Sequence, residues 1–156
     1  MNLMTTLNDN LIFIPGQIPS LKNTKIMGKF QPKTVTQWLR LFGIQNYSIR
    51  RKEVNYFKTI KGEYNIQEIV APLRIQIDKY LETNTYPIKL GLHFVRKTKR
   101  SWDFHNICQI LFDIFTTLEV IPDDDVNHVL PFPLLLDGKW YSLDKDNPGV
   151  YIKVLT

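Results

Sequence analysis

The apolar residues of this chain follow two kinds of pattern. Short alternating or continuous apolar runs bounded by turn residues predict β-strands at residues 11–16, 86–97, 126–132 and 149–155. Apolar residues spaced three and four positions apart predict helices at residues 34–42, at 66–83 or 72–83, and at 104–118. The order strand, helices, strand, helix, strand, strand is typical of an α+β (mixed α/β) fold, with helices packed on a small mixed sheet.

Local signals leave the start of the second helix open. Asn65 followed by Glu68 resembles a capping box, whereas Pro72 is typical of a first helical turn. In either case the helix has a buried stripe, formed by Ile69, Leu73, Ile77, Tyr80 and Leu81. Residues 45–65 interleave aromatic and basic side chains, which fits either a surface that follows a nucleic-acid backbone or a cap on the core. The Asp-Gly and Pro-Gly pairs of residues 135–149 indicate a turn or hairpin.

Length and composition limit the class of protein. A chain of 156 residues with 44% hydrophobic residues fits one domain, residues 1–156, with a real core. The single cysteine, Cys108, excludes an internal disulfide and a Cys-x-x-Cys zinc site, and we expect it to be a small core residue. No apolar run reaches the roughly 20 residues of a membrane helix, and the N-terminus is unlike a secretory signal. We therefore expect a soluble, cytoplasmic protein that does not bind membranes.

Charge is distributed unevenly along the chain. Residues 1–102 hold 17 Lys and Arg against 6 Asp and Glu, and residues 103–156 hold 3 against 9. This gives balances of +11 and −6, which add up to the formal net charge of +5. A basic surface beside an acidic centre suits an enzyme that acts on a polyanion, in which the carboxylates hold cations. Lysines that only keep the surface soluble are the other explanation.

The acidic centre brackets the helix at 104–118. Asp103 directly precedes this helix, and Asp123, Asp124 and Asp125 follow it. Taken singly, Asp103 suits an N-cap and the aspartate triplet a polar turn. Taken together, they form one cation pocket only if the chain folds so that the two ends of the helix meet, because a helix of about 15 residues is roughly 22 Å long. The nuclease hypothesis depends on that convergence.

The spacing of the polar residues resembles that of the RusA family of Holliday-junction resolvases, which are common in phages and prophages. The family pattern is Asp-x-Asp-Asn, a Lys three residues later, an Asp after four more, a Gly after six more, and an Asp-Asp pair after a further four. Without a gap, Asp103, Asn106, Asp113 and the pair Asp123-Asp124 match this pattern. The segments "IPGQIPSLKN" and "NPGVYIKV" are similar to the first and last strands of the family. Residues 24–65 match nothing in it.

Three positions depart from the family. His105 replaces the second acidic residue, Gln109 replaces the lysine, and Glu119 replaces the glycine. An imidazole is a poor ligand for Mg²⁺ but is tolerated by Mn²⁺. Glutamine can donate a hydrogen bond but cannot neutralise a phosphate. The departures therefore allow an active variant with altered ligands, a slow enzyme, or a relative that only binds DNA.

The resemblance implies a metal-dependent endodeoxyribonuclease that cleaves branched DNA, such as four-way junctions, as a homodimer in a prokaryotic or phage-infected cell. Mg²⁺, with Mn²⁺ as an alternative, is the implied cofactor. The implied catalytic residues are Asp103, Asp113, Asp123 and Asp124. The metal ligands would be Asp103, Asp123, Asp124 and His105. For nucleic-acid contacts we expect Arg96, Lys97, Lys99, Arg100, Lys22, Asn23, Asn106 and Gln109.

Two alternatives stay open at this point. The first is a catalytically impaired relative that binds junctions, and the second is a small basic domain whose aspartates are only caps and turns. For Asp113, whose helical position is shared with Asn106 and Gln109, facing the site and facing solvent are equally compatible with the pattern. His93 and His128 are interpreted as packing or surface residues.

Overall fold

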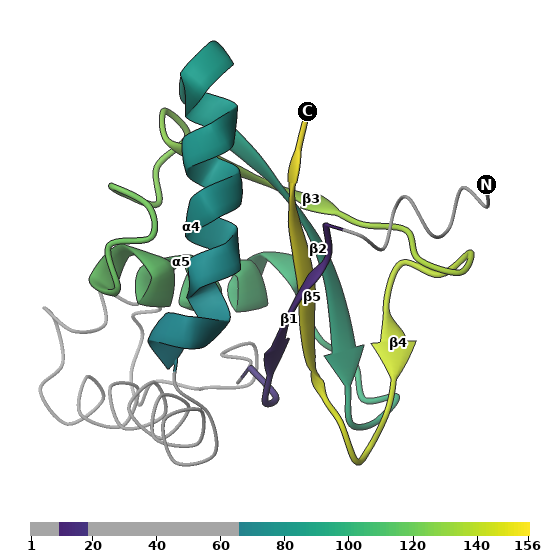
Figure 1. Ribbon diagram of the computed structural model, residues 1–156. Helices are drawn as coiled ribbons and strands as arrows, with labels where there is room; N and C mark the ends of the chain where they lie inside the picture. Colours follow the sequence, from purple (N-terminus) through teal and green to yellow (C-terminus); the bar gives the residue numbers. More distant parts are fainter. Residues whose placement is uncertain (1–9, 19–65) are drawn as a thin grey trace, which may run out of the picture.

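The computed structural model describes residues 10–18 and 66–156, which form a mixed β-sheet and two helices (Figure 1). The strands are β1 (Ile12–Pro15), β2 (Ile88–Arg96), β3 (Val129–Pro133), β4 (Ser142–Leu143) and β5 (Gly149–Leu155). They pair in the order β1-β5-β2-β3, with β4 beside the end of β2. The helices are α4 (Ile66–Thr83) and α5 (Phe104–Thr117). The predicted α+β fold is confirmed, whereas the helix predicted at 34–42 and the segment 45–65 lie outside the described residues.

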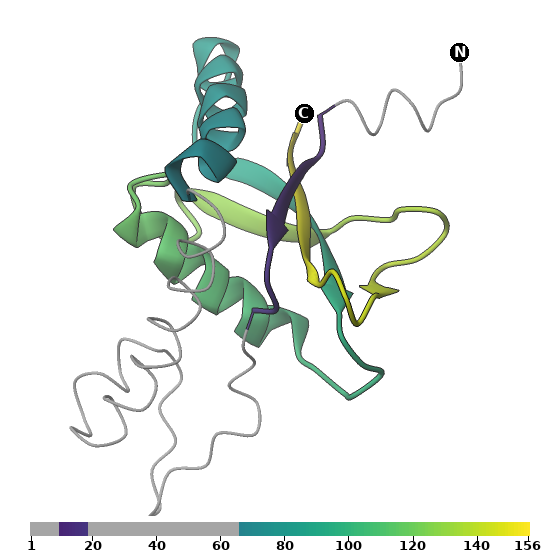
Figure 2. The same cartoon turned by 60° about the horizontal axis from the view of Figure 1, so that its bottom comes forward.

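Both helices cover the same face of the sheet (Figure 2), and the core lies between them and the strands. In the central strand β2 the alternating residues Ile88, Leu90, Leu92 and Phe94 are buried in this core, as the pattern predicted. The opposite face of β2 is buried as well from Gly91 onward, where residues from the 135–147 segment lie over His93 and Val95. The sequence pattern did not predict this second buried face.

Helix α4 packs against β1 and β5 through its apolar stripe. Val70, Leu73 and Ile77 are buried, and the other predicted stripe residues pack against the core while partly exposed. The helix begins at Ile66, so Pro72 lies inside it and does not mark its first turn. Asn65, the proposed capping residue, lies outside the described residues.

Helix α5 links β2 to β3, which pair in parallel from Ile88 opposite Val129 to Leu92 opposite Pro133. A parallel neighbour must start at the end of the sheet where β2 starts, so α5 carries the chain back along the full length of β2. Strand β3 begins three residues later than predicted, because the backbone N–H groups of His128 and Val129 donate to the carbonyl of Asp125 in a turn.

The end of α5 has the geometry of a Schellman motif. Leu118 is the C-cap, Glu119 donates to the carbonyl of Thr116 (3.0 Å) and Val120 to that of Phe115 (2.8 Å). Glu119 has φ of 58°, in the left-handed region that favours glycine. The guanidinium of Arg74, from α4, donates to the carbonyls of Leu118 (2.6 Å) and Glu119 (2.9 Å). A cation of α4 thus caps the C-terminus of α5 and joins the two helices.

The segment after β3 forms the predicted hairpin. Leu136 and Lys139 exchange two backbone hydrogen bonds of 2.9 Å around Asp137 and Gly138, whose φ values are 52° and 72°. Positive φ at both central residues is the type I′ geometry that an Asp-Gly pair favours. Within the part of the chain that the structure describes, neither helix combines the length and the apolar character that a membrane span needs.

Candidate functional site

The polar residues of the proposed signature share one side of α5. Its opposite side is buried, with Ile107, Cys108, Ile110, Leu111, Phe112, Ile114 and Phe115 in the core. His105 is exposed, and Asn106, Gln109 and Asp113 are half-buried. One carboxylate oxygen of Asp113 is itself inaccessible to solvent. The helix therefore has a polar stripe on the side away from the core, the outward stripe, which is half-buried beyond His105 and is spread along the helix axis.

Asp103 is the N-cap of α5. Its Oδ1 accepts the backbone N–H groups of His105 (2.9 Å) and Asn106 (3.4 Å), which would otherwise lack a partner in the first helical turn. The capping interpretation of Asp103 is thus confirmed. It does not exclude a ligand role, because Oδ2 makes no hydrogen bond to the described residues.

The three aspartates beyond α5 are exposed and form a turn. Asp123 accepts the N–H of Asp124 (2.8 Å), and Asp125 accepts the N–H of Asn127 (3.1 Å) and the Nδ1–H of His128 (2.5 Å). Asp124 differs from both, because its carboxylate has no hydrogen-bond partner among the described residues. Of the triplet, Asp124 is the residue best placed to interact with something outside the fold.

The acidic groups at the two ends of α5 do not converge within one chain. Asp103 caps the start of the helix, near the end of β2, whereas Asp123–Asp125 precede β3, beside the start of β2. The 14 residues of α5 correspond to about 21 Å between these ends. The convergence on which the expected single-chain cation pocket depends is therefore not formed by the described residues, because the parallel crossover holds the two ends of α5 apart.

No set of three or more His, Cys, Asp or Glu side chains in residues 10–18 and 66–156 is arranged so that it could hold a metal ion. Mg²⁺ needs several oxygen ligands within about 2.1 Å of the ion. The candidate ligands Asp103 and His105 at one end, and Asp123 and Asp124 at the other, do not fit a shared Mg²⁺ within one chain.

The basic turn after β2 lies next to Asp103. Lys97, Lys99 and Arg100 are exposed, as expected of phosphate contacts. Arg96 differs from them, because it is only 8% exposed and donates from Nη1 to the carbonyl of Ile18 at 2.9 Å. Its guanidinium also lies 5.6 Å from the centre of the Trp102 ring, and burial lowers its pKa from the ordinary value. Arg96 therefore joins β2 to the N-terminal segment instead of facing a ligand.

Lys22 and Asn23, the other predicted nucleic-acid contacts, lie outside the described residues. Cys108 is buried, as predicted, and burial together with the nearby charge of Asp103 raises the pKa of its thiol far above the ordinary value. A protonated, inaccessible thiol is not a nucleophile. The candidate site therefore consists of two groups, one at each end of α5.

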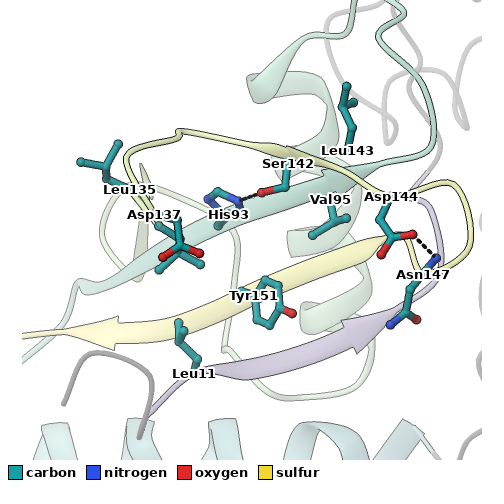
Figure 3. A pocket seen from close by; sticks show the side chains of 11 residues that line it. Leu11, His93, Val95, Leu135, Asp137, Ser142, Leu143, Asp144, Asn147 and Tyr151 are labelled. Carbon is teal, nitrogen blue, oxygen red and sulfur yellow. Dashed lines mark hydrogen bonds between the residues drawn. The ribbon is translucent and has the colours of Figure 1, made fainter. Parts of the chain in front are cut away.

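A cavity of about 480 Å³ lies on the face of the sheet opposite the helices (Figure 3). In its floor, His93 is 1% exposed. Its Nδ1 is 2.9 Å from the carbonyl of Leu134, and its Nε2 is 2.6 Å from the hydroxyl of Ser142. Because a carbonyl only accepts, Nδ1 carries the proton and Nε2 accepts from Ser142. His93 is thus a packing residue, one of the two roles that the sequence left open, and it attaches β4 to the sheet.

The lining of this cavity does not suit a phosphate. Asp137 and Asp144 lie on it, and no Lys or Arg is among the described residues that line it. A polyanion would be repelled there, so the cavity is not the place where DNA would bind. Three exposed cations, Lys97, Lys99 and Arg100, lie together on the turn between β2 and α5.

Comparison with known proteins adds no relative to this description. Neither a family model, nor a curated protein, nor a solved structure matches the chain.

Proposed function

We propose that this protein is a metal-dependent endodeoxyribonuclease that cleaves phosphodiesters in branched DNA as a homodimer. The observation that carries the proposal is the arrangement around α5. Asn106, Gln109 and Asp113 lie on its outward stripe, an exposed basic turn adjoins its start, and exposed carboxylates follow its end. The spacing of these residues resembles that of the RusA resolvases, for which Mg²⁺, or Mn²⁺ as an alternative, is the implied cofactor.

A two-fold axis would resolve the separation of the carboxylates. If the outward stripes of two α5 helices pack antiparallel, the start of one helix lies beside the end of the other. Asp103 and His105 of one chain would then approach Asp123 and Asp124 of the partner chain, and the same contact would occur twice. A four-way junction also has two-fold symmetry, so two equivalent sites suit that substrate. The proposal therefore requires a dimer, and a monomer would have no complete site.

The residues of one chain have distinct roles in this proposal. Lys97, Lys99 and Arg100 would neutralise phosphates beside the start of α5. Asn106 and Gln109 would donate hydrogen bonds to the DNA backbone, although Gln109 brings no positive charge. Asp103 would combine its observed capping role, through Oδ1, with a ligand role through Oδ2.

A catalytically impaired DNA-binding relative is the second candidate function. Two observations favour it: His105 and Gln109 stand in the places of an acid and a lysine, and the carboxylates of one chain lie apart. This candidate shares the basic surface with the first. It predicts binding of junctions without cleavage in any metal.

The test is an assay of cleavage and binding on a synthetic four-way junction, with Mg²⁺ and with Mn²⁺. We expect cleavage by the dimer, and Asp124→Asn should abolish it while junction binding is retained or strengthened. Asp103→Asn is the sharper variant, because asparagine is as good an N-cap as aspartate. It should leave the melting temperature unchanged and remove cleavage, whereas Asp103→Ala should also lower stability by about 1 kcal/mol.

The outcomes separate the two candidates. Junction binding without cuts in either metal favours the impaired relative. Cleavage by Asp124→Asn at the wild-type rate contradicts the site assignment, and so does cleavage by a protein that sedimentation shows to be monomeric. His105→Asp should shift the metal preference towards Mg²⁺ if His105 is a ligand.

A further inference from the structure

The hairpin that carries β4 presents large apolar side chains to solvent. Trp140 is 59% exposed, and Tyr141 and Leu143 are each 41% exposed. Exposed aromatic side chains grouped in this way are typical of binding surfaces, whereas single exposed apolar residues are common everywhere. We name Lys139, Trp140, Tyr141 and Leu143 the hairpin surface.

The fold holds this surface in a fixed position. Ser142 and Leu143 pair with Val95 and Arg96 at the end of β2. The ring of Tyr141 meets that of Trp102 edge to face, with centroids 5.4 Å apart. Trp102 in turn packs on the buried Phe94, at 5.6 Å. Tyr141 is therefore anchored to the core through a row of aromatic rings, and a ligand that binds it would not have to order it first.

A hollow of about 420 Å³ lies within the hairpin surface. It is lined by residues 138–143, so that both Trp140 and Tyr141 contribute to its wall. This hollow adjoins the cavity of Figure 3, because Ser142 and Leu143 line both, and the carboxylates of Asp137 and Asp144 lie on the side of that cavity. A planar ring that entered the hollow would meet two aromatic side chains and no carboxylate group.

Exposed cations lie next to the hairpin surface, which the exposed carboxylates of Asp137 and Asp144 flank as well. The N–H of Asp144 donates to the carbonyl of Arg96 at 2.9 Å, which places the end of β4 beside the basic turn. Figure 1 shows β4 alongside the end of β2, where this turn begins. Lys97, Lys99 and Arg100 of the turn are exposed, and Lys139 adds a further cation on the hairpin itself.

We infer that the hairpin surface and the basic turn together bind unpaired nucleotides of single-stranded DNA. Bases would stack on Trp140 and Tyr141, and the phosphates between them would lie on Lys97, Lys99 and Arg100. Aromatic rings beside a row of cations are the arrangement that single-strand binding uses. A protein partner would use these cations only through acidic side chains of its own, whereas every nucleotide carries both a ring that stacks and a phosphate, so the pairing of rings with cations favours nucleic acid. The inference rests on the proposed function for its substrate class, and it assigns the open bases at a branch point to this surface.

The experiment measures binding of the full chain to a fluorescein-labelled oligothymidylate by fluorescence anisotropy. Trp140→Ala and Tyr141→Ala should each weaken binding by about 5- to 150-fold, the range for the loss of one stacked base. Trp140→Phe should retain most of the affinity, because phenylalanine still stacks. Ile75→Ala is the matched control, since Ile75 is 67% exposed on α4, and it should bind as the wild type does.

A second measurement tests the basic turn. Log Kd should rise linearly with log salt, and replacing Lys97 and Lys99 by Ala should reduce that slope while replacing Trp140 should not. The inference is overturned if Trp140→Ala and Tyr141→Ala bind the oligonucleotide as tightly as the wild type. It is also overturned if the wild type does not bind it, in which case the hairpin surface is left to a protein partner.

Failure of this inference is distinguishable from failure of the proposed function. If no metal supports cleavage of the junction and Trp140 is still needed for binding, the nuclease proposal fails and the inference stands. If the wild type cleaves junctions and Trp140→Ala binds single strands normally, the inference fails and the nuclease proposal stands.

Discussion

Glu119 lies at a position where the backbone of α5 favours glycine, and replacing it should stabilise the protein. Its φ of 58° belongs to the left-handed region, in which an L-residue costs roughly 1–2 kcal/mol. Glycine removes this cost. Its greater conformational freedom in the unfolded chain lowers the free energy of unfolding by about 0.5 kcal/mol or slightly more. The two hydrogen bonds of the Schellman motif and the carbonyl contact with Arg74 involve only backbone atoms of this segment, so Glu119→Gly retains them.

The expected gain is therefore about 1 kcal/mol in the free energy of unfolding, or roughly 2–4 °C in Tm for a chain of this size. Urea denaturation and thermal melting, both followed by circular dichroism, measure it. Glu119→Ala separates charge from backbone, because alanine removes the carboxylate at the C-terminus of α5 but keeps the strain. The difference between the Gly and Ala variants is then the backbone contribution alone.

Lys79 provides a control position at which glycine should be less stable than alanine. It is exposed inside α4, in right-handed helix, where glycine is less stable than alanine by about 1 kcal/mol. The Gly variant should thus be more stable than the Ala variant at position 119 and less stable than the Ala variant at position 79. If Gly and Ala are equally stable at 119, or Gly is the less stable there, the left-handed end of α5 is not formed in solution.

Three further predictions concern contacts that hold the elements together. Arg74→Met should lower the free energy of unfolding by about 1–3 kcal/mol, because the last carbonyls of α5 lose a charged donor. An unchanged midpoint of urea denaturation would contradict the capping of α5 by Arg74. Ser142→Ala should cost a similar amount by leaving the Nε2 atom of buried His93 without a donor, and Ser142→Thr, which keeps the hydroxyl, should cost less. Burial raises the pKa of the Cys108 thiol, so native protein should not react with a thiol reagent at mildly alkaline pH and should react after unfolding in urea. Above the ordinary thiol pKa the unfolded chain ionises and the folded one does not, so the wild type should lose stability relative to Cys108→Ala as pH rises.

The elements of this fold were predictable wherever the pattern is local. The alternation from Ile88 to Phe94 and the helical spacing from Ile107 to Ile114 depend on residues a few positions apart, and both were confirmed. The capping role of Asp103 and the Asp-Gly turn of the hairpin also depend on residues only a few positions apart. The left-handed backbone at Glu119 was not predicted, because the sequence analysis noted this position only as a departure from a glycine of the RusA pattern.

Contacts between distant segments were not predictable from these signals. Arg96 belongs by sequence to a basic run, yet its guanidinium is buried because Ile18, 78 positions away, offers a carbonyl. His93 lies on the face of β2 that the alternation left to solvent, yet the 135–147 segment buries it. Neither partner has a signature of its own, since any backbone carbonyl or hydroxyl can take that role. The second buried face of β2 would have required knowing where the hairpin folds.

The separation of Asp103 from Asp124 has a more general cause. A helix between two parallel, adjacent strands must return the chain from the end of the first strand to the level of its start. Acidic residues that flank such a helix are therefore held apart by its whole length, whatever their spacing in the sequence. A second chain, related by a two-fold axis across the helix, would bring residues from the two ends together without breaking the sheet. Whether the acidic residues of this protein share a cation is thus a question about its oligomeric state, and a monomer that still cleaved DNA would require a different set of ligands.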